Sequence, residues 1–257
     1  MIAPRKMPEK YAEWNWQHGA PDGRLIRRRT RLFATANTIE RLRGPFAIQV
    51  NNTTRAFEYP WAYEAGRLQP GLKTLEIGGG LGGFQFVLDQ QQCQVTNVDP
   101  GMEGEGWPCN AESMGKLNRL FGAKVQLLNT TIAQANLPDA AFDRVFCLSV
   151  IEHLSETEAR SSMQQAHRCL KPGGLFVITA DLFLNLKPFC SRPANQFGSN
   201  QNLRNLIDED QWLLVEGDRS CLYGFAEFDH DRIQSNLENY FIGKYPTLVQ
   251  CLVLQKR

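Results

Sequence analysis

The sequence predicts an α/β fold: a doubly wound, mostly parallel sheet of seven strands with helices on both faces. Three observations predict it. Apolar runs of strand length alternate with helically spaced residues between 72 and 180. A glycine-rich turn follows the first of these runs, and residues 1–70 before it have mostly helical spacing. We expect a helical N-terminal cap at 1–70 and a core domain at 71–257, which carries a substrate-side insertion at 182–235.

The expected cap contains an amphipathic stretch at Arg24–Arg43, whose apolar positions are Leu25, Ile26, Leu32, Phe33, Ile39 and Leu42. Its basic residues Arg24, Arg27, Arg28, Arg29 and Arg31 allow two interpretations, a phosphate- or RNA-binding patch or a solvated helix face. The net charge of +1 favours the solvated face, so we expect no nucleic-acid partner. A smaller acidic substrate remains an open alternative.

The apolar runs of the core define the expected strands. Five of them should form near residues 73–77, 94–98, 124–128, 143–149 and 174–180. Two further candidates are Trp212–Val215 and Thr247–Gln255, which follow a loop rich in Pro, Asn and Ser.

The glycine turn is the most informative segment. The apolar run Lys73–Ile77 leads into Gly78-Gly79-Gly80-Leu81-Gly82-Gly83, and Phe84–Leu88 continues with helical spacing. Glycines let a ligand approach the backbone closely, and the free N–H groups of a helix N-terminus favour a carboxylate or phosphate. The spacing fits both GxGxxG and GxGxG, so it predicts a cofactor cradle without selecting the cofactor. Glu76 indicates which kind of cofactor binds, because a carboxylate under the turn suits a ligand with an ammonium group better than one with a pyrophosphate.

A second acid follows the second strand. Asp99 comes directly after Gln94–Val98, 21 positions beyond Gly78, where a βαβ nucleotide site holds ribose hydroxyls. The alternative is that Asp99-Pro100-Gly101 is an ordinary turn. The insertion Gly101–Trp107 is a candidate lid, and its two acids lack the supporting ligands of a metal site, so we expect no metal.

Composition limits the class of protein. The 257 residues suffice for one elaborated α/β domain, and the seven cysteines are scattered without a CxxC or CxxxCxxC pattern. This argues against zinc and iron–sulfur sites and suits a reducing cytoplasm. The N-terminal segment lacks the features of a secretory signal, and no apolar run reaches membrane-spanning length. We expect a cytoplasmic protein with no membrane partner, and the sequence does not indicate its oligomeric state.

Two later segments complete a set of four motifs. Ala141–Leu154 is an apolar strand that ends in Ser149-Val150-Ile151-Glu152-His153, and Cys169–Thr179 contains Leu170-Lys171-Pro172-Gly173-Gly174 before another apolar run. With the glycine turn and the acid after strand two, this ordered set resembles the class I S-adenosylmethionine-dependent methyltransferases, in particular the bacterial small-molecule group. The resemblance covers roughly Leu75 to Thr179 and implies a Rossmann-like fold whose last strand runs in reverse.

The resemblance also implies roles for residues. Glu76 would support the amino group of S-adenosylmethionine, the glycines would surround its methionine end, and Asp99 would accept bonds from the ribose hydroxyls. Thr131-Ile132 replaces the Asp-Ala pair that many relatives carry beside adenine, which weakens that assignment. The cofactor-binding residues implied in this way are Glu76, Gly78, Gly79, Gly80, Gly82, Asp99, Pro100, Thr131, Ile132, Leu148, Ser149, Tyr59 and Trp61.

Three of the implied roles have a plain structural alternative. Tyr59 or Trp61, just before the first strand, would pack on adenine or face the sulfonium, or would only anchor the cap. His153 is the best candidate for a general base, since it follows the fourth strand and titrates near neutral pH. Its alternative is to pack at, or cap, the start of a helix.

The predicted function is methyl transfer from S-adenosylmethionine to a hydroxyl or amine of a small molecule, such as a secondary metabolite or a sugar-type intermediate. Two alternatives remain open. A catalytically silent relative would bind the cofactor and act as a partner protein. An NAD(P)-dependent oxidoreductase would use the GxGxxG spacing but would leave Glu76 and the two later motifs unexplained.

Overall fold

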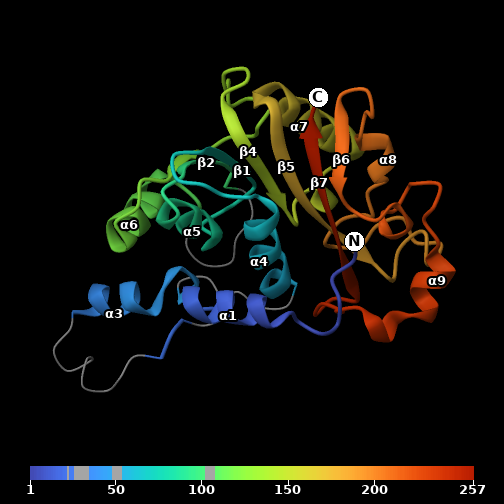
Figure 1. Cartoon of the computed structure of the whole chain (residues 1–257), viewed down its shortest axis with the longest axis horizontal. Coiled ribbons are helices and arrows are strands. Elements are labelled where there is room, and N and C mark those ends of the chain that lie inside the picture. The colour runs from blue at the N-terminus through green and yellow to red at the C-terminus, as the bar shows by residue number, and fades with distance from the viewer. Residues whose placement is uncertain (22, 26–34, 48–53, 102–107) are drawn as a thin grey trace. The chain divides into compact units, whose positions relative to one another are not determined.

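The computed structural model describes residues 1–21, 23–25, 35–47, 54–101 and 108–257, and its seven strands confirm the predicted α/β class (Figure 1). The chain forms two compact units, one of Pro8–Ala135 and one of Met1–Met7 with Asn136–Arg257. Most of the arginine run, at 27–31, and most of the expected lid, at 102–107, lie outside the described residues.

The Pro8–Ala135 unit contains three parallel strands in the order β3-β2-β1. Their bounds match the predicted runs closely: β1 is Lys73–Ile77, β2 is Gln94–Val98 and β3 is Gln126–Leu128. The connecting helices are α5 (Phe84–Gln90) and α6 (Ala111–Phe121). Ile77 pairs with Val98 at the carboxyl ends of β1 and β2, so the residues that follow these two strands meet at one sheet edge.

The N-terminal helices belong to the same unit as β1–β3. They are α1 (Glu9–His18), α3 (Ala36–Arg43), the 3₁₀ turn η1 (Pro45–Ala47) and α4 (Arg55–Ala65). The two compact units divide after Ala135, and the division into a helical cap at 1–70 and a core at 71–257 with an insertion at 182–235 stays a prediction. Part of the stripe expected over Arg24–Arg43 forms the helix α3, in which Ile39 is half-buried, whereas Leu25 and Leu42 are exposed.

The second unit carries the strand order β4-β5-β7-β6. Its strands are β4 (Phe142–Leu148), β5 (Leu170–Phe183), β6 (Trp212–Glu216) and β7 (Thr247–Lys256). β4 and β5 are parallel, whereas β7 is antiparallel to both β5 and β6, which confirms the predicted reversal of the last strand (Figure 1).

The described helices of this unit are short except for α7. They are η2 (Ile151–His153), α7 (Glu156–Cys169), α8 (Leu203–Leu206), η3 (Arg219–Cys221), α9 (His230–Ser235) and η4 (Leu237–Asn239). A capping box between Ser155 and Glu158 starts α7. β5 begins at Leu170, so Pro172-Gly173-Gly174 lies inside the strand, beside a register shift against β4. Among the described helices, none has the length and apolarity to cross a bilayer.

Candidate functional site

The glycine turn adopts a backbone that few other residues tolerate. Gly78 and Gly80 have φ values of +70° and +53°, in the left-handed region. The Gly78 N–H donates to the carbonyl of Val98 at 2.8 Å, which carries the β1–β2 pairing into the turn. Among the described residues, a Cβ added to Gly80 would meet only Asp99 Oδ2, at 3.9 Å, so the described chain leaves space directly above the second acid.

Glu76 lies beneath this turn. Its side chain is 3% exposed, and a Cβ added to Gly79 would lie 2.6 Å from its Cδ. Among the described residues, Oε2 of Glu76 has no hydrogen-bond partner. Burial raises the pKa of Glu76 to about 8; the charge of Asp99 raises it further, and the Arg55 guanidinium opposes both. A buried carboxyl group with an unused oxygen is suited to a cationic ligand.

Asp99 is buried at the same sheet edge, held by backbone groups. Its Oδ2 accepts the Gly80 N–H at 2.8 Å and its Oδ1 accepts the Gly101 N–H at 2.7 Å. The Cys109 thiol also bonds to it, and burial, with the nearby Asp99 charge, raises the pKa of that thiol to about 12. The structure thus brings together Glu76, the turn glycines and Asp99, as the sequence predicts.

Two buried amide side chains, Asn97 and Gln85, hold the turn in place, and neither is among the residues predicted from the sequence. Asn97 Oδ1 accepts the Gly79 N–H at 3.2 Å, and Asn97 Nδ2 donates to the Gly80 carbonyl at 2.8 Å. Gln85 Nε2 donates to the Gly82 carbonyl at 2.9 Å, and its Oε1 accepts from Asn97 at 3.0 Å. Both side chains are fully buried. Their signal in the sequence is a polar residue inside an apolar strand and another inside an apolar helix start.

The segment after β3 approaches Asp99 through a different residue from those predicted. Asn129 Nδ2 donates to the Asp99 carbonyl at 2.9 Å. Thr131 is exposed, and its hydroxyl donates to Gln134 at 3.2 Å, while Ile132 is buried. Pro100, next to Asp99, is exposed. These contacts do not test adenine binding, so the roles of Thr131, Ile132 and Pro100 stay predictions.

Tyr59 and Trp61 of α4 are both buried. The Tyr59 ring stacks on Phe46 at 5.6 Å and on Phe84 at 5.3 Å between ring centroids. Phe46 also fills the space beside Gly83, where an added Cβ would lie 2.5 Å from its ring. These contacts favour the packing alternative for Tyr59: it links η1, α4 and α5 behind the glycine turn.

The remaining predicted residues lie in the other unit. Leu148 ends β4 and is 8% exposed, and Ser149 follows it with a φ of +52°, an uncommon conformation for a residue other than glycine. The Ser149 N–H donates to the backbone and side-chain oxygens of Thr179, at 3.2 and 3.1 Å. A residue other than glycine with a positive φ carries backbone strain, and strained residues cluster at binding and active sites.

His153 is exposed at the end of η2. Its Nδ1 lies 2.5 Å from the carbonyl oxygen of Phe197. A carbonyl only accepts, so Nδ1 is the donor, and a neutral ring then carries its lone pair on Nε2. This is the form that a general base requires.

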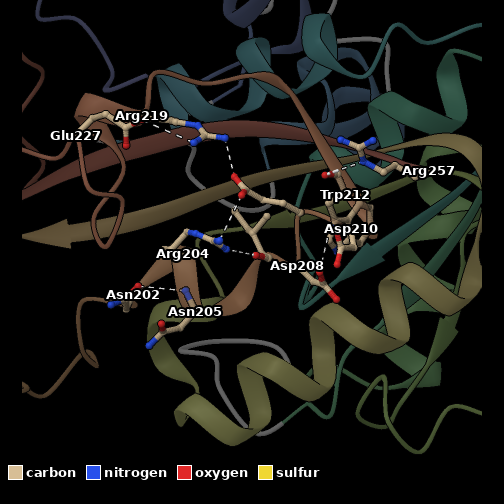
Figure 2. A network of polar contacts seen from close by, with 11 residues as sticks. Asn202, Arg204, Asn205, Asp208, Asp210, Trp212, Arg219, Glu227 and Arg257 are labelled. Carbon is tan, nitrogen blue, oxygen red and sulfur yellow. Dashed lines mark hydrogen bonds and ion pairs between the residues drawn. The ribbon is translucent and has the colours of Figure 1, made fainter.

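A cavity of about 500 Å³ beside β6 has none of the predicted site residues in its lining. Arg219 and Glu209 contribute to its wall with Trp212, and Figure 2 shows the surrounding polar network. Arg204 and Arg219 both pair with Glu209, at 3.3 and 2.6 Å. Arg219 also lies 3.7 Å from Glu227, so two carboxylates offset these two guanidinium groups, and the network by itself selects neither an anionic nor a cationic ligand.

The residues of the Pro8–Ala135 unit fit S-adenosylmethionine. The unpartnered oxygen of Glu76 suits the ammonium group of its amino-acid end, and the space above Gly80 would be filled by any side chain. Asp99 presents carboxylate oxygens to hydroxyl donors at the same edge. Within the described ranges no group of three or more His, Cys, Asp or Glu side chains forms a metal site.

Comparisons with known proteins agree with this fit. Residues 75–178 match the family described as "Methyltransferase domain". The chain is 28% identical to the sterol 24-C-methyltransferase of Yarrowia lipolytica over 124 residues, which cover 48% of this chain and 31% of that protein. It is 30% identical to phosphoethanolamine N-methyltransferase 2 of Caenorhabditis elegans over 115 residues, 44% of this chain and 25% of that protein. The chain therefore spans less than a third of the length of either relative.

Solved structures share the fold at low identity. The [4+2]-cyclase SpnF matches with a TM-score of 0.56 and 15% identity, over 77% of this chain and 80% of that chain. The 1,6-didemethyltoxoflavin-N1-methyltransferase of Burkholderia thailandensis, whose structure contains S-adenosylhomocysteine, matches with a TM-score of 0.51 and 15% identity, over 99% of this chain and 94% of that one. The family match supports S-adenosylmethionine over a nicotinamide as the cofactor, and the solved structures show the shared fold. Through residues 75–178, the chain carries a methyltransferase domain of the class I S-adenosylmethionine-dependent type.

Proposed function

We propose that this protein transfers the methyl group of S-adenosylmethionine to a hydroxyl or amine of a small molecule. The observation that carries the proposal is Glu76: a buried carboxyl group whose Oε2 lacks a hydrogen-bond partner in the described chain, directly under Gly79. The negative charge of a nucleotide pyrophosphate would keep this carboxyl group protonated, whereas the ammonium group of a methionine moiety favours the carboxylate and compensates its charge.

When bound, S-adenosylmethionine supplies an electrophilic methyl group on a sulfonium. Glu76 orients the amino-acid end, and Asp99, with the Gly80 and Gly101 N–H groups on its carboxylate, provides a fixed acceptor for ribose hydroxyls. Asn97 and Gln85 hold the turn between these two acids. Rigid placement is the main requirement of an in-line displacement, and correct alignment can contribute roughly 7–11 kcal/mol to lowering a barrier.

His153 is the proposed general base. Removal of a proton from a hydroxyl or amine requires an unprotonated nitrogen within reach of the acceptor. The Phe197 carbonyl occupies Nδ1, which leaves Nε2 to take that proton. A positioned base of this kind typically contributes about 10²–10⁴-fold in rate.

A small acceptor is supported by the names of the similar proteins. One is a phosphoethanolamine N-methyltransferase and another acts on didemethyltoxoflavin at nitrogen, whereas the sterol enzyme is a C-methyltransferase. A cytoplasmic location is supported by the seven cysteines, all of which are free thiols.

A second candidate is a cofactor-binding protein that does not transfer the methyl group. A protein named as a cyclase shares the fold, so the fold alone does not determine the reaction. The Thr131-Ile132 pair, which departs from the usual Asp-Ala, is the residue-level observation that favours this candidate.

The test is formation of S-adenosylhomocysteine, followed by mass spectrometry with a panel of hydroxyl, amine and carbon acceptors that includes phosphoethanolamine. We expect product with at least one hydroxyl or amine acceptor and a loss of about 10²-fold in the His153→Ala variant. Product with carbon acceptors only would overturn the acceptor class. Binding of S-adenosylhomocysteine without turnover on any acceptor would favour the second candidate.

A further inference from the structure

We propose that the turn Asn195–Gly198 is a positioning element that fixes the tautomer of His153. Phe197 of this turn lies 44 residues beyond the histidine, within the same compact unit. The inference rests on the proposed base role of His153 for its importance to turnover, but the tautomer itself is measured without turnover.

The turn is closed by its own hydrogen bonds. The Asn195 N–H donates to the Gly198 carbonyl at 2.9 Å, and the Gly198 N–H donates back to the Asn195 carbonyl at 3.2 Å. The Phe197 N–H donates to Asn195 Oδ1 at 2.8 Å. This Asx geometry directs the Phe197 carbonyl outward from the turn, where it meets the histidine.

Further bonds attach the segment that begins with this turn to the backbone on both sides of His153. The Ser199 N–H donates to the Glu152 carbonyl at 3.0 Å, and Gln201 Nε2 donates to the Leu154 carbonyl at 2.9 Å. Gln201 is 6% exposed, so its bond is protected from water. The His153 backbone is therefore held on either side while Phe197 contacts its ring.

Gly198 is the residue that permits this approach. It has a φ of +132°, and a Cβ built on it would lie 2.0 Å from the Glu152 carbonyl oxygen and 3.2 Å from His153 Cα. Both contacts are to backbone, which cannot rotate away as a side chain can. Any residue larger than glycine must displace the turn from residues 152–153.

The ring of Phe197 supports the turn from another direction. It packs on Tyr245 with 3.8 Å between ring centroids, and this tyrosine lies just before β7. Phe197 is thus held through its ring, while its carbonyl holds His153 Nδ1.

The contact with the Phe197 carbonyl determines which nitrogen of His153 carries the proton. A free histidine side chain favours the neutral form with its proton on Nε2, which is the wrong form for a base that must accept at Nε2. A hydrogen bond from Nδ1–H to a fixed carbonyl selects the other tautomer, because the proton on one nitrogen is set by the partner of that nitrogen. Nucleophiles and bases oriented by a third group follow the same logic.

The experiment is ¹⁵N NMR of the imidazole rings at alkaline pH, where the neutral form dominates, with His153 assigned from the His153→Gln variant. In the wild-type protein we expect the shifts of an Nδ1–H tautomer for His153. Gly198→Ala should move them toward the Nε2–H tautomer and reduce methyl transfer by about 10²-fold. The matched control is Gly173→Ala: this glycine also has a positive φ, of +73°, but its added Cβ would approach nothing closer than 4.0 Å.

A second variant covers the case in which Gly198→Ala does not fold. Asn195→Ala removes only the side-chain bond to Phe197, and we expect a smaller shift in the same direction. An Nε2–H tautomer in the wild-type protein would overturn the proposal, as would an Nδ1–H tautomer that survives in both variants. The expected shifts together with full turnover in His153→Ala would instead contradict the proposed base role and leave the positioning contact standing.

Discussion

Binding of the cofactor should release a proton from Glu76. The carboxyl group is buried, with a pKa near 8, and the charged or titratable groups that act on it are Arg55, Asp99 and the Tyr59 phenol. At pH 6 most of the ligand-free protein therefore carries a proton on Glu76. An ammonium group favours the carboxylate, so the proton must leave when the cofactor binds.

The size of the loss in cofactor affinity at low pH follows from the difference between the pH and the pKa of Glu76. Each pH unit below 8 adds about 1.4 kcal/mol to the cost of ionising Glu76. The affinity for S-adenosylhomocysteine should fall by up to about 10-fold per unit, or roughly 10²-fold between pH 8 and pH 6. The stability of the ligand-free protein has the opposite dependence. Because the folded pKa is raised above the ordinary value of 4.5, the native state holds the extra proton between these values, and stability declines as the pH rises toward 8.

The assay is titration calorimetry with S-adenosylhomocysteine in two buffers of different ionisation enthalpy. The wild-type protein should release close to one proton per cofactor at pH 6 and fewer at pH 9. Glu76→Gln keeps the shape and removes the acid, so its binding should be weaker at pH 8 and should lose the proton release. Proton release that is equal in the wild-type and Glu76→Gln proteins would refute the reasoning.

Three further changes test the surroundings of the site and one surface network. Gly79→Ala should weaken S-adenosylhomocysteine binding by at least about 10-fold in calorimetry, because the new Cβ would lie 2.6 Å from Glu76 Cδ; unchanged affinity would show that the carboxyl moves freely. Asn97→Leu should lower the free energy of unfolding in urea by about 2–4 kcal/mol, since the Gly79 N–H and Gly80 carbonyl lose a buried partner; a cost below 1 kcal/mol would contradict this. Glu209→Gln should cost less than about 1 kcal/mol and only at low salt, because its two ion pairs are exposed; a larger, salt-independent loss would count against that estimate.

The strand pattern was predictable because apolar runs of strand length are a local signal. Lys73–Ile77 and Gln94–Val98 were predicted with the observed bounds, and the acids beside them follow from strand ends that share an edge. The direction of β7 came from the resemblance, since a sequence run carries no information about whether its neighbour is parallel.

The side chains and contacts that hold the site residues in place were not predictable from the sequence. Asn97 sits in a strand and Gln85 in a helix, and alone each resembles a solvent-facing position; only the packed turn reveals that both are buried. The contact between His153 and the Phe197 carbonyl joins backbone and side chain across 44 residues, and no local pattern encodes it. The stripe over Arg24–Arg43 did not determine burial at Leu42, which is exposed, because periodicity records apolar residues whether or not a partner covers them.

The most direct test of the account is a crystal structure of the complex with S-adenosylhomocysteine. We expect the amino group of the cofactor to lie about 3 Å from a carboxylate oxygen of Glu76, with the ribose hydroxyls on Asp99. A cofactor bound with its amino group away from Glu76, or with its ribose beyond the reach of Asp99, would contradict it.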